Sequence, residues 1–206
     1  MRVHLIDALT ESQIDEAVQL IVNTFCNDEG EIEELVMKCY TGNDIDILKL
    51  YARAIVQAAN LVGHIFVTTE GDLWPAPMIS AAFCWEPGQS LWATKEQREL
   101  GFDQLSAAIS PDTRIFWGEV KQVGDTLKAE HGLSSMPMDT FYVNMLVTDR
   151  HFQNRGFGTA VMKAVLAFLR TEEGGMLVLS LRVLKIEIEP YGDFVTMFVF
   201  DPYKTS

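Results

Sequence analysis

The stretch Phe141–Ala160, FYVNMLVTDRHFQNRGFGTA, decides how this chain is interpreted. It is strand-like up to Thr148, turns, and continues as a helix that opens on Gly156 and Gly158. The start of a helix presents backbone N–H groups without partners and the positive end of the helix dipole, so it binds phosphate well. Glycine lets the backbone approach such a ligand without a Cβ in the way. The stretch therefore predicts an anion-binding turn between a strand and a helix.

Two better-known phosphate-binding turns do not match this stretch. A dinucleotide-binding turn needs a third glycine or an alanine where this chain has Val161. A P-loop needs a lysine followed by serine or threonine directly after its last glycine, and neither glycine here has one. Two glycines at a helix start are also common packing and capping residues. An unrelated α/β binding domain, in which both glycines only cap the helix, therefore stays open.

Together, the strand, the glutamine and the two glycines resemble the coenzyme-binding segment of the GNAT superfamily of acetyl-CoA-dependent N-acetyltransferases. The phosphate motif of that family, [QR]-x-x-G-x-[GA], is met by Gln153, Gly156 and Gly158. The segment Leu146–Gln153, LVTDRHFQ, is similar to the form L-A-T-x-P-x-[YF]-Q of one branch, with valine for alanine and arginine for proline. The resemblance is specific over about residues 139–175.

The resemblance implies a mode of binding for acetyl-CoA, the acyl-donor cosubstrate. Its pyrophosphate would lie on amides of the motif loop, and its pantetheine arm would pair with the preceding strand as an extra strand would. One N–H of that strand would polarise the thioester carbonyl. No metal is expected. The coenzyme-binding residues expected on this basis are Leu146, Val147, Thr148, Gln153, Asn154, Arg155, Gly156, Phe157, Gly158 and Thr159.

The resemblance also implies a catalytic acid that protonates the departing thiolate. Family members commonly use a tyrosine within a segment like N-x-x-[FY]-Y-x-x-x-G-F, which corresponds here to Leu184–Phe194. A gapless alignment on Phe194 places Glu189 at the tyrosine, whereas a short slip brings Tyr191 there. We prefer Tyr191, because a phenol can donate a proton and an ionised carboxylate cannot. Both registers stay open, as does an ordinary turn role for Tyr191.

No general base stands out from the sequence. Asn144 occupies a strand position where some relatives carry a carboxylate, and an amide cannot act as a base. Four residues are candidates, although each is equally explained as a solvated surface group: Glu86, Glu119, His131 and Asp139. Three tryptophans could line an amine pocket through cation–π contact or simply pack in the core: Trp85, Trp92 and Trp117.

Composition limits the partners without identifying one. The 206 residues include 16 basic and 29 acidic side chains, a formal charge of −13, which argues against nucleic acid and is compatible with a cationic amine. There is no apolar run of membrane-spanning or signal-peptide length, so we expect no membrane partner and a cytoplasmic or nuclear location. Cys26, Cys39 and Cys84 form no CxxC pair and fit reduced thiols. Monomer and homodimer both stay open.

Hydrophobic periodicity predicts one mixed α/β domain over residues 1–206, with a helical N-terminal part at about 8–60. The family resemblance implies a coenzyme-binding core at about 139–175. Thr10 and Gln13 match a helix capping box. Strands are expected at 3–6, 64–69, 78–85, 139–148, 176–181 and 194–200, and helices at 11–25, 31–39, 45–59, 113–129 and 156–170. The GNAT-like fold implied by the family is a central twisted sheet flanked by helices and splayed between Leu146 and the strand after the motif helix.

We therefore expect an N-acetyltransferase that moves an acetyl group from acetyl-CoA to a primary amine of a small molecule or peptide by direct attack. The alternative is a catalytically degenerate relative that binds coenzyme A and serves as a sensor or interaction module.

Overall fold

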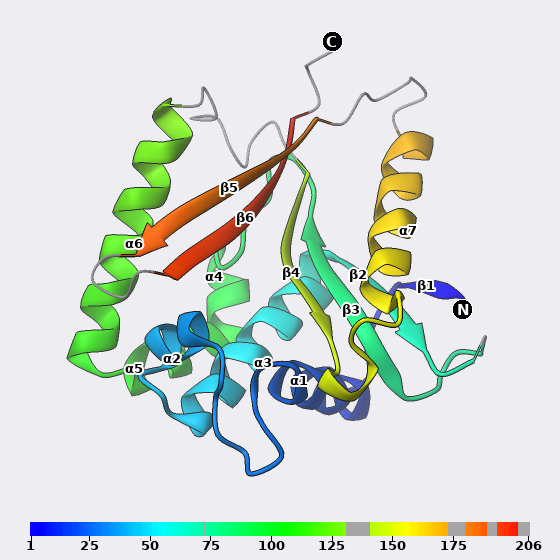
Figure 1. Cartoon of the computed structure of the whole chain (residues 1–206), viewed down its shortest axis with the longest axis horizontal. Coiled ribbons are helices and arrows are strands. Elements are labelled where there is room, and N and C mark those ends of the chain that lie inside the picture. The colour runs from blue at the N-terminus through cyan, green and yellow to red at the C-terminus, as the bar shows by residue number, and fades with distance from the viewer. Residues whose placement is uncertain (72, 131–140, 173–179, 189–192, 202–206) are drawn as a thin grey trace.

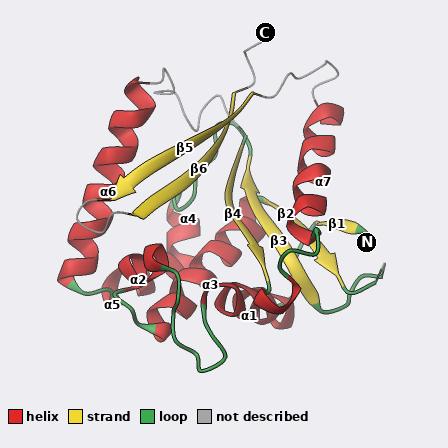
Figure 2. Cartoon of the chain, in the orientation of Figure 1, coloured by secondary structure: helices red, strands yellow, loops and turns green. Residues whose placement is uncertain are grey.

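The computed structural model describes residues 1–71, 73–130, 141–172, 180–188 and 193–201 (Figure 1). It confirms a mixed α/β chain in which helices flank a central sheet (Figure 2). The strands are β1 (Val3–Ile6), β2 (His64–Thr69), β3 (Met78–Trp85), β4 (Tyr142–Thr148), β5 (Ser180–Ile188) and β6 (Asp193–Asp201). The helices are α1 (Glu11–Phe25), α2 (Leu35–Thr41), α3 (Ile45–Val62), α4 (Lys95–Gln97), α5 (Asp103–Ala108), α6 (Pro111–Glu130) and α7 (Phe157–Glu172). A π-helical turn at Arg98–Phe102 and a 3-10 turn at Arg150–Phe152 complete the described elements.

The first four strands form one antiparallel sheet in the order β1-β2-β3-β4. All eight residues of β3 are buried, because helices cover both of its faces. This explains why β3 reads as an almost unbroken apolar run rather than an alternating one. β4 is the last strand of this sheet, so one of its edges has no partner within it.

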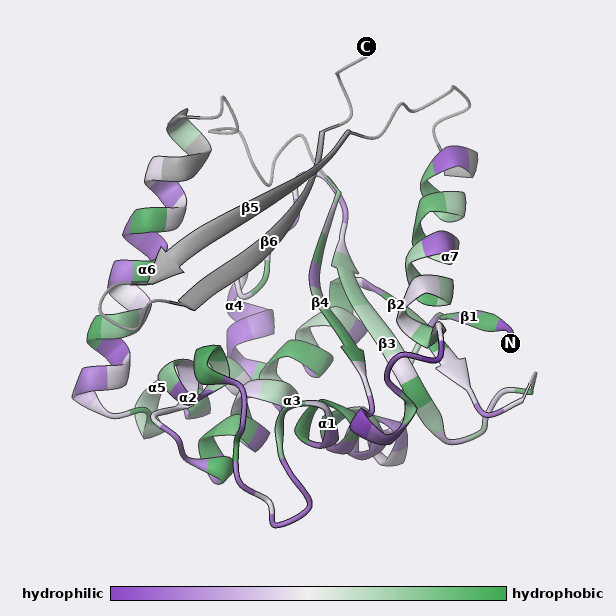
Figure 3. Cartoon of the chain, in the orientation of Figure 1, coloured by the Kyte–Doolittle hydropathy of each residue, from purple (hydrophilic) through white to green (hydrophobic). Residues whose placement is uncertain are grey.

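Helices α1 and α3 pack on one face of the sheet, and α7 packs on the other (Figure 1). The first interface joins the two helices to β3 and β4 through Ile21, Ile55, Phe83 and Val147. The second joins α7 to β2 and β3 through Val161, Val165, Phe66 and Cys84. The turn between β4 and α7 is hydrophilic over most of its length (Figure 3). It therefore forms a polar rim where the sheet ends.

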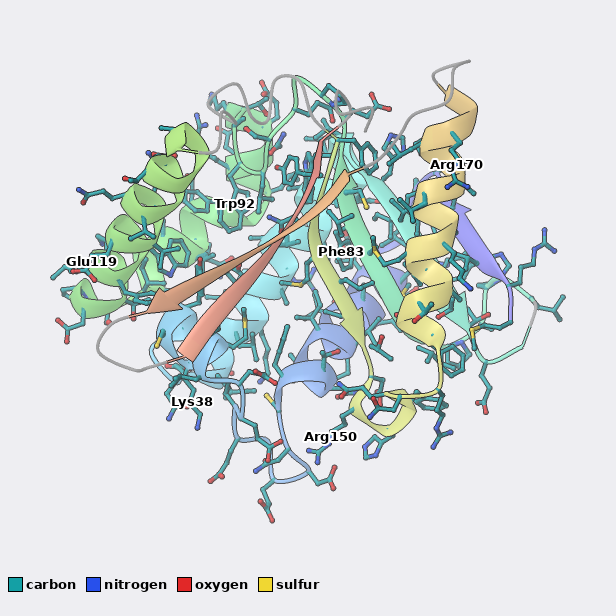
Figure 4. All side chains as sticks on the ribbon, turned by 45° about the horizontal axis from the view of Figure 1, so that its top comes forward. Lys38, Phe83, Trp92, Glu119, Arg150 and Arg170 are labelled. Carbon is teal, nitrogen blue, oxygen red and sulfur yellow. The ribbon has the colours of Figure 1, made fainter. Side chains whose placement is uncertain are left out.

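Strands β5 and β6 form a separate antiparallel hairpin, paired from Ser180 and Asp201 to Ile188 and Asp193. The hairpin approaches β4 at one end and diverges from it toward α6, as the two views of Figures 1 and 4 agree. The splay expected beside Leu146 thus takes the form of two separate sheets. Of the strand expected at 176–181, residues 176–179 lie outside the described ones, and β5 covers Ser180–Ile188, so it ends later than expected.

The capping box at the start of α1 is confirmed. The Thr10 hydroxyl accepts from the Gln13 N–H at 3.4 Å, and the Gln13 side chain accepts from the Thr10 N–H at 2.9 Å. The helix expected at 113–129 is also confirmed, as α6. Within the described residues, no helix is long and apolar enough to cross a bilayer.

The helix expected at 31–39 was placed too early. α2 begins at Leu35, because the Asn27 side chain accepts from the N–H groups of Glu29 and Glu31 and closes a loop there. Gly42 ends the helix in the left-handed region with φ 66°. The strand expected at 139–148 likewise begins later, at Tyr142, and residues 131–140 lie outside the described ones.

Candidate functional site

The turn between β4 and α7 is held in place by Asp149. Its N–H donates to the carbonyl of Ile79 on β3 at 2.9 Å. One carboxylate oxygen accepts from the His151 N–H at 2.9 Å, and the other accepts from the Asn23 side chain at 2.9 Å. Because Asn23 belongs to α1, the turn is fixed to both the sheet and a helix. The start of α7 is therefore positioned firmly relative to the end of β4.

Two residues of the motif adopt left-handed backbone conformations. Asn154 has φ 60° and Gly156 has φ 85°. A Cβ added at Gly156 would meet no atom within 4 Å, so glycine is needed there for its backbone angle and not for space. Between them, the exposed Arg155 carries its guanidinium over the Phe152 ring, 5.2 Å from the centroid. The motif thus places a cation beside the helix start.

The first turn of α7 presents three backbone N–H groups. The first helical hydrogen bond runs from the Ala160 N–H to the carbonyl of Gly156 at 2.9 Å. The N–H groups of Phe157, Gly158 and Thr159 precede this bond, so no carbonyl of the helix can reach them. Together with the helix dipole they suit a phosphate group.

Gly158 is needed for a close approach of α7 to β4. A Cβ there would lie 3.2 Å from the Thr148 hydroxyl oxygen and 4.0 Å from the Leu146 side chain. A larger residue would require Thr148 or the helix start to shift by a few tenths of an ångström. The two glycines of the motif therefore have different roles: Gly156 shapes the turn, and Gly158 brings the helix amides up to the end of β4.

A buried hydroxyl pair fixes Thr148. The Ser80 hydroxyl donates to the carbonyl of Val147 at 2.6 Å and lies 2.8 Å from the Thr148 hydroxyl. Because the single hydroxyl proton of Ser80 is already donated to Val147, the Thr148 hydroxyl must donate to Ser80. Ser80 is fully buried, so this arrangement holds the surface against which Gly158 packs. The pairing was not predicted, because Ser80 lies on β3, far from the motif in the sequence.

The open edge of β4 carries backbone groups that point away from the sheet. In an antiparallel pair, every second residue directs both its N–H and its C=O to the partner strand. The bond from Asp149 to Ile79 fixes this alternation, so Val147 faces β3 while Leu146 and Thr148 face the open edge. The Gln153 side chain donates to the Thr148 carbonyl at 3.1 Å, in agreement with that assignment. The outward N–H and C=O of Leu146 lie just beyond.

β4 also contains a bulge that sequence reasoning did not predict. Phe83 pairs with Met145 and Cys84 pairs with Val143, so Asn144 is the extra residue. Its side chain is exposed. A bulge bends the strand and increases its local twist, and it does so where the hairpin diverges. No residue pattern in β4 signals it, because asparagine is acceptable in a strand and in a bulge alike.

Arg150 has a structural role and does not add to the positive charge of the motif. Its guanidinium donates to the carbonyl of Cys26 at 3.0 Å and lies 3.6 Å from the Asp28 carboxylate (Figure 4). His151 lies 3.6 Å from the same carboxylate. Arg155 is therefore the motif cation that remains beside the amides of α7.

Several predicted catalytic residues lie outside the described residues: Tyr191, Glu189, His131 and Asp139. Glu86 follows β3 and accepts from His64 at 2.6 Å, next to the Phe168 ring of α7. Glu119 is exposed on the outer side of α6 (Figure 4). Neither carboxylate lies along the open edge of β4 near Leu146. Among the described residues, no three His, Cys, Asp or Glu side chains are grouped so that they could hold a metal ion.

The three tryptophans have separate environments. Trp85 is fully buried and stacks on Tyr142 with ring centroids 5.8 Å apart, so it belongs to the core. Trp92 and Trp117 are half-buried and lie nearly parallel at 6.2 Å within a group of aromatic side chains. The three cysteines are free thiols, and burial raises the pKa of each.

No protein-family model and no curated protein sequence matches this chain. Its backbone is similar to a crystal structure described as histone acetyltransferase HPA2 and related acetyltransferase from Corynebacterium glutamicum, with 12% identity, 97% of this chain and 94% of that chain covered, and a TM-score of 0.42. It is also similar to a mosquito arylalkylamine N-acetyltransferase like 5b, with 9% identity, coverage of 98% and 93%, and a TM-score of 0.40. Both of those proteins are described as acetyltransferases.

Proposed function

We propose that this chain binds acetyl-CoA between the start of α7 and the open edge of β4 and transfers the acetyl group to a primary amine. One observation carries the proposal: the unpartnered amides of Phe157, Gly158 and Thr159 begin where the outward-facing edge of β4 ends. An anion site and a free strand edge thus meet at one point. Acetyl-CoA has a charged pyrophosphate followed by an arm with two amides, so its chemistry matches both parts.

The residues fit the two parts of the cosubstrate. The three amides of α7 and the Arg155 guanidinium suit the pyrophosphate. The outward N–H and C=O of Leu146 can pair with the amides of the arm, as an added strand would. The Thr148 carbonyl is already bound by Gln153, which leaves the Thr148 N–H for the ligand. In this arrangement Gln153 and Asn154 shape the turn, while Val147 anchors the strand through its buried side chain.

The chemistry needs a polarised thioester and a neutral amine. A strand N–H at the open edge stabilises the negative charge that develops on the thioester oxygen. The amine nitrogen forms a bond to the carbonyl carbon, the carbon–sulfur bond breaks, and the nitrogen loses a proton to a base. The departing thiolate takes up a proton, for which we propose Tyr191. The net negative charge of −13 favours the approach of a protonated amine, which must give up one proton to become the neutral nucleophile before it attacks.

Two measurements on the purified chain test the proposal. Ligand binding to the native state stabilises it and so raises the melting temperature. At a ligand concentration one hundred times Kd the stabilisation is about 2.7 kcal/mol. We expect coenzyme A and acetyl-CoA to give this shift and adenosine to give a much smaller one. Thiol release on a panel of primary amines then tests transfer. A rise in melting temperature without release of the coenzyme A thiol in the presence of any amine would favour the coenzyme-binding module. The absence of such a rise would overturn the proposal.

A further inference from the structure

The first half of the motif turn is attached to helix α1 at two points (Figure 1). The Asn23 side chain, in the last turn of α1, donates to the Asp149 carboxylate at 2.9 Å. The next residue of the turn, Arg150, donates from its guanidinium to the carbonyl of Cys26 at 3.0 Å. Asn23 and Cys26 are three positions apart, so they lie on one side of the helix end. Two attachments on one side fix the direction of the turn as well as its distance from α1.

Arg150 binds a carbonyl that α1 cannot satisfy by itself. Cys26 ends the helix, where the last carbonyls have no partner within the helix. A cation is favourable at this negative end of the helix dipole, yet the last turn of α1 contains no basic residue. Arg150 supplies the cation from a position 124 residues along the chain. Its side chain is only 30% exposed, so it is not an ordinary solvated arginine.

The nearby carboxylate of Asp28 is a weaker partner. It lies 3.6 Å from Arg150 and 3.6 Å from the ring nitrogen of His151. The Asp28 side chain is 73% exposed, and an ion pair so open to water contributes little. A hydrogen bond from a charged, half-buried guanidinium to the Cys26 carbonyl is stronger. The attachment of the turn therefore depends on Arg150 and Cys26 more than on the acidic loop that follows α1.

The second half of the turn takes its position from the first. A 3-10 turn begins after Asp149 and is closed by a hydrogen bond of 2.8 Å from the Phe152 N–H to the Asp149 carbonyl. Beyond it, Asn154 and Gly156 set the direction of the chain through left-handed backbone angles, and α7 follows at once. A rotation of the 3-10 turn would therefore carry the free amides of α7 with it.

We propose that Arg150 is a positioning residue of the coenzyme site. Its hydrogen bond to α1 holds the motif turn so that the amides of Phe157, Gly158 and Thr159 are in place before the phosphates arrive. This rests on the proposed function, because the ligand concerned is the pyrophosphate of acetyl-CoA. The similar family segment has proline at this position, and proline would fix only its own backbone angle. Arginine instead joins the turn to a second element, which lowers the cost of ordering the site on binding.

The effect of Arg150 should appear in the binding of acetyl-CoA and not in the chemical step. A displaced anion site weakens binding equally in the ground state and in the transition state, so KM should rise while kcat stays almost unchanged. A loss of folding stability alone would lower the active fraction, and with it the apparent kcat. The ratio of the two constants thus separates positioning from a merely structural role.

Salt dependence separates positioning from direct contact with a phosphate. Salt weakens the attraction between an exposed cation and an anion. Removal of a cation that touches the phosphates, as we expect for Arg155→Gln, should therefore make coenzyme A binding less dependent on salt. Arg150→Gln should keep the salt dependence of the unmodified chain, because Arg150 acts through the backbone of the turn.

Isothermal titration with coenzyme A measures the binding. Arg150→Gln should raise Kd about tenfold, as expected for the loss of one hydrogen bond from a charged donor. Asn23→Ala removes the other attachment without removing a charge and should raise Kd about fivefold. Arg114→Gln is the matched control, because the Arg114 guanidinium also donates to a backbone carbonyl, that of Ser106 at 2.6 Å, away from the motif. It should bind coenzyme A as the unmodified chain does.

Hydrogen exchange in the chain without ligand tests the attachment itself. The N–H groups of Asp149, His151 and Phe152 are all hydrogen-bonded at the turn. They should exchange about tenfold faster in Arg150→Gln and at an unchanged rate in Arg114→Gln. If Arg150→Gln does not fold, Arg150→Lys serves in its place, because lysine keeps the charge without the rigid fork of donors. Its Kd should rise about threefold.

The outcomes separate this inference from the proposed function. If the unmodified chain does not bind coenzyme A, the proposed function fails and the inference falls with it. If the unmodified chain binds coenzyme A and the folded Arg150 variant binds within twofold of it, the inference alone is overturned. Unchanged hydrogen exchange at the turn would also overturn the inference. A weaker salt dependence in Arg150→Gln would do so as well, because Arg150 would then contact the phosphates.

Discussion

Gly158→Val tests the motif turn at its tightest point. The added Cβ would lie 3.2 Å from the Thr148 hydroxyl oxygen, and Thr148 cannot yield easily because its hydroxyl is bound to the buried Ser80. The two methyl groups of valine must then point toward Leu146 or out over the free amides of α7. In the first case the helix start is displaced from the strand. In the second, a methyl occupies the place of a phosphate oxygen.

The expected magnitude follows from these contacts. Overpacking of this kind costs about 1–3 kcal/mol of folding stability, which a domain of this size can lose and stay folded. Loss of one well-aligned amide, or its displacement by a few tenths of an ångström, should weaken coenzyme A binding at least tenfold, which is about 1.4 kcal/mol. The affinity for coenzyme A should fall even in the fraction of the variant that is folded, because its binding site is distorted.

Isothermal titration with coenzyme A measures the affinity, and thermal unfolding shows whether the variant is folded. Gly118→Val on α6 is the matched control, since a Cβ at Gly118 meets no atom within 4 Å. It should bind coenzyme A as the unmodified chain does. If folded Gly158→Val binds coenzyme A within twofold of the unmodified chain, the turn is not part of the site and the reasoning is refuted.

Three further predictions concern the acid, the alkaline stability and the first helix. Tyr191→Phe should lower kcat by about ten- to a hundredfold with little change in the KM for acetyl-CoA, and loss of activity in Glu189→Gln instead would show that the gapless register is right. Burial raises the pKa of Tyr142 to about 12, against about 10 in the unfolded chain. The contribution of this residue to folding stability is therefore complete below pH 10 and is lost as the pH rises through 12. Tyr142 should therefore account for about 2–3 kcal/mol of the fall in the free energy of unfolding, measured in urea, over that range, and this share should be absent in Tyr142→Phe. Thr10→Ala removes the capping hydroxyl of α1 and should cost about 1 kcal/mol in urea unfolding; an unchanged midpoint would show that the cap adds nothing.

Local patterns were enough to predict most of the elements. The capping box and the apolar spacing predicted α1 to the residue, and the Gly-rich segment predicted the start of α7 within one residue. Helix α2 was misplaced because the Asn27 side chain competes for backbone N–H groups that a helix would otherwise use. Such a competition depends on the geometry of the loop, and the spacing of apolar residues carries no information about that geometry.

The site was only partly predictable for a related reason. The motif residues follow one another in the chain, so Gly156, Gly158 and Gln153 could be identified from spacing alone. The Ser80–Thr148 pair, the bulge at Asn144 and the stacked pair of Trp92 and Trp117 are each made by segments far apart in the sequence. Trp92 and Trp117 could be noted as candidates, but their rings come together only because the turn at Trp92 is bound to α3 and α6 packs against α2.

The free edge of β4 also has a consequence for the behaviour of the chain in solution. A strand edge with unpaired N–H and C=O groups is a template on which a second molecule can add its own strand, which is how sheet proteins aggregate. Two features of β4 oppose this: the bulge at Asn144 breaks the regular ladder, and Gln153 already occupies the carbonyl of Thr148. Between them only Leu146 offers a complete backbone pair. The same edge is thus long enough for a small ligand and too short for a neighbouring strand, so concentrated samples should remain dispersed.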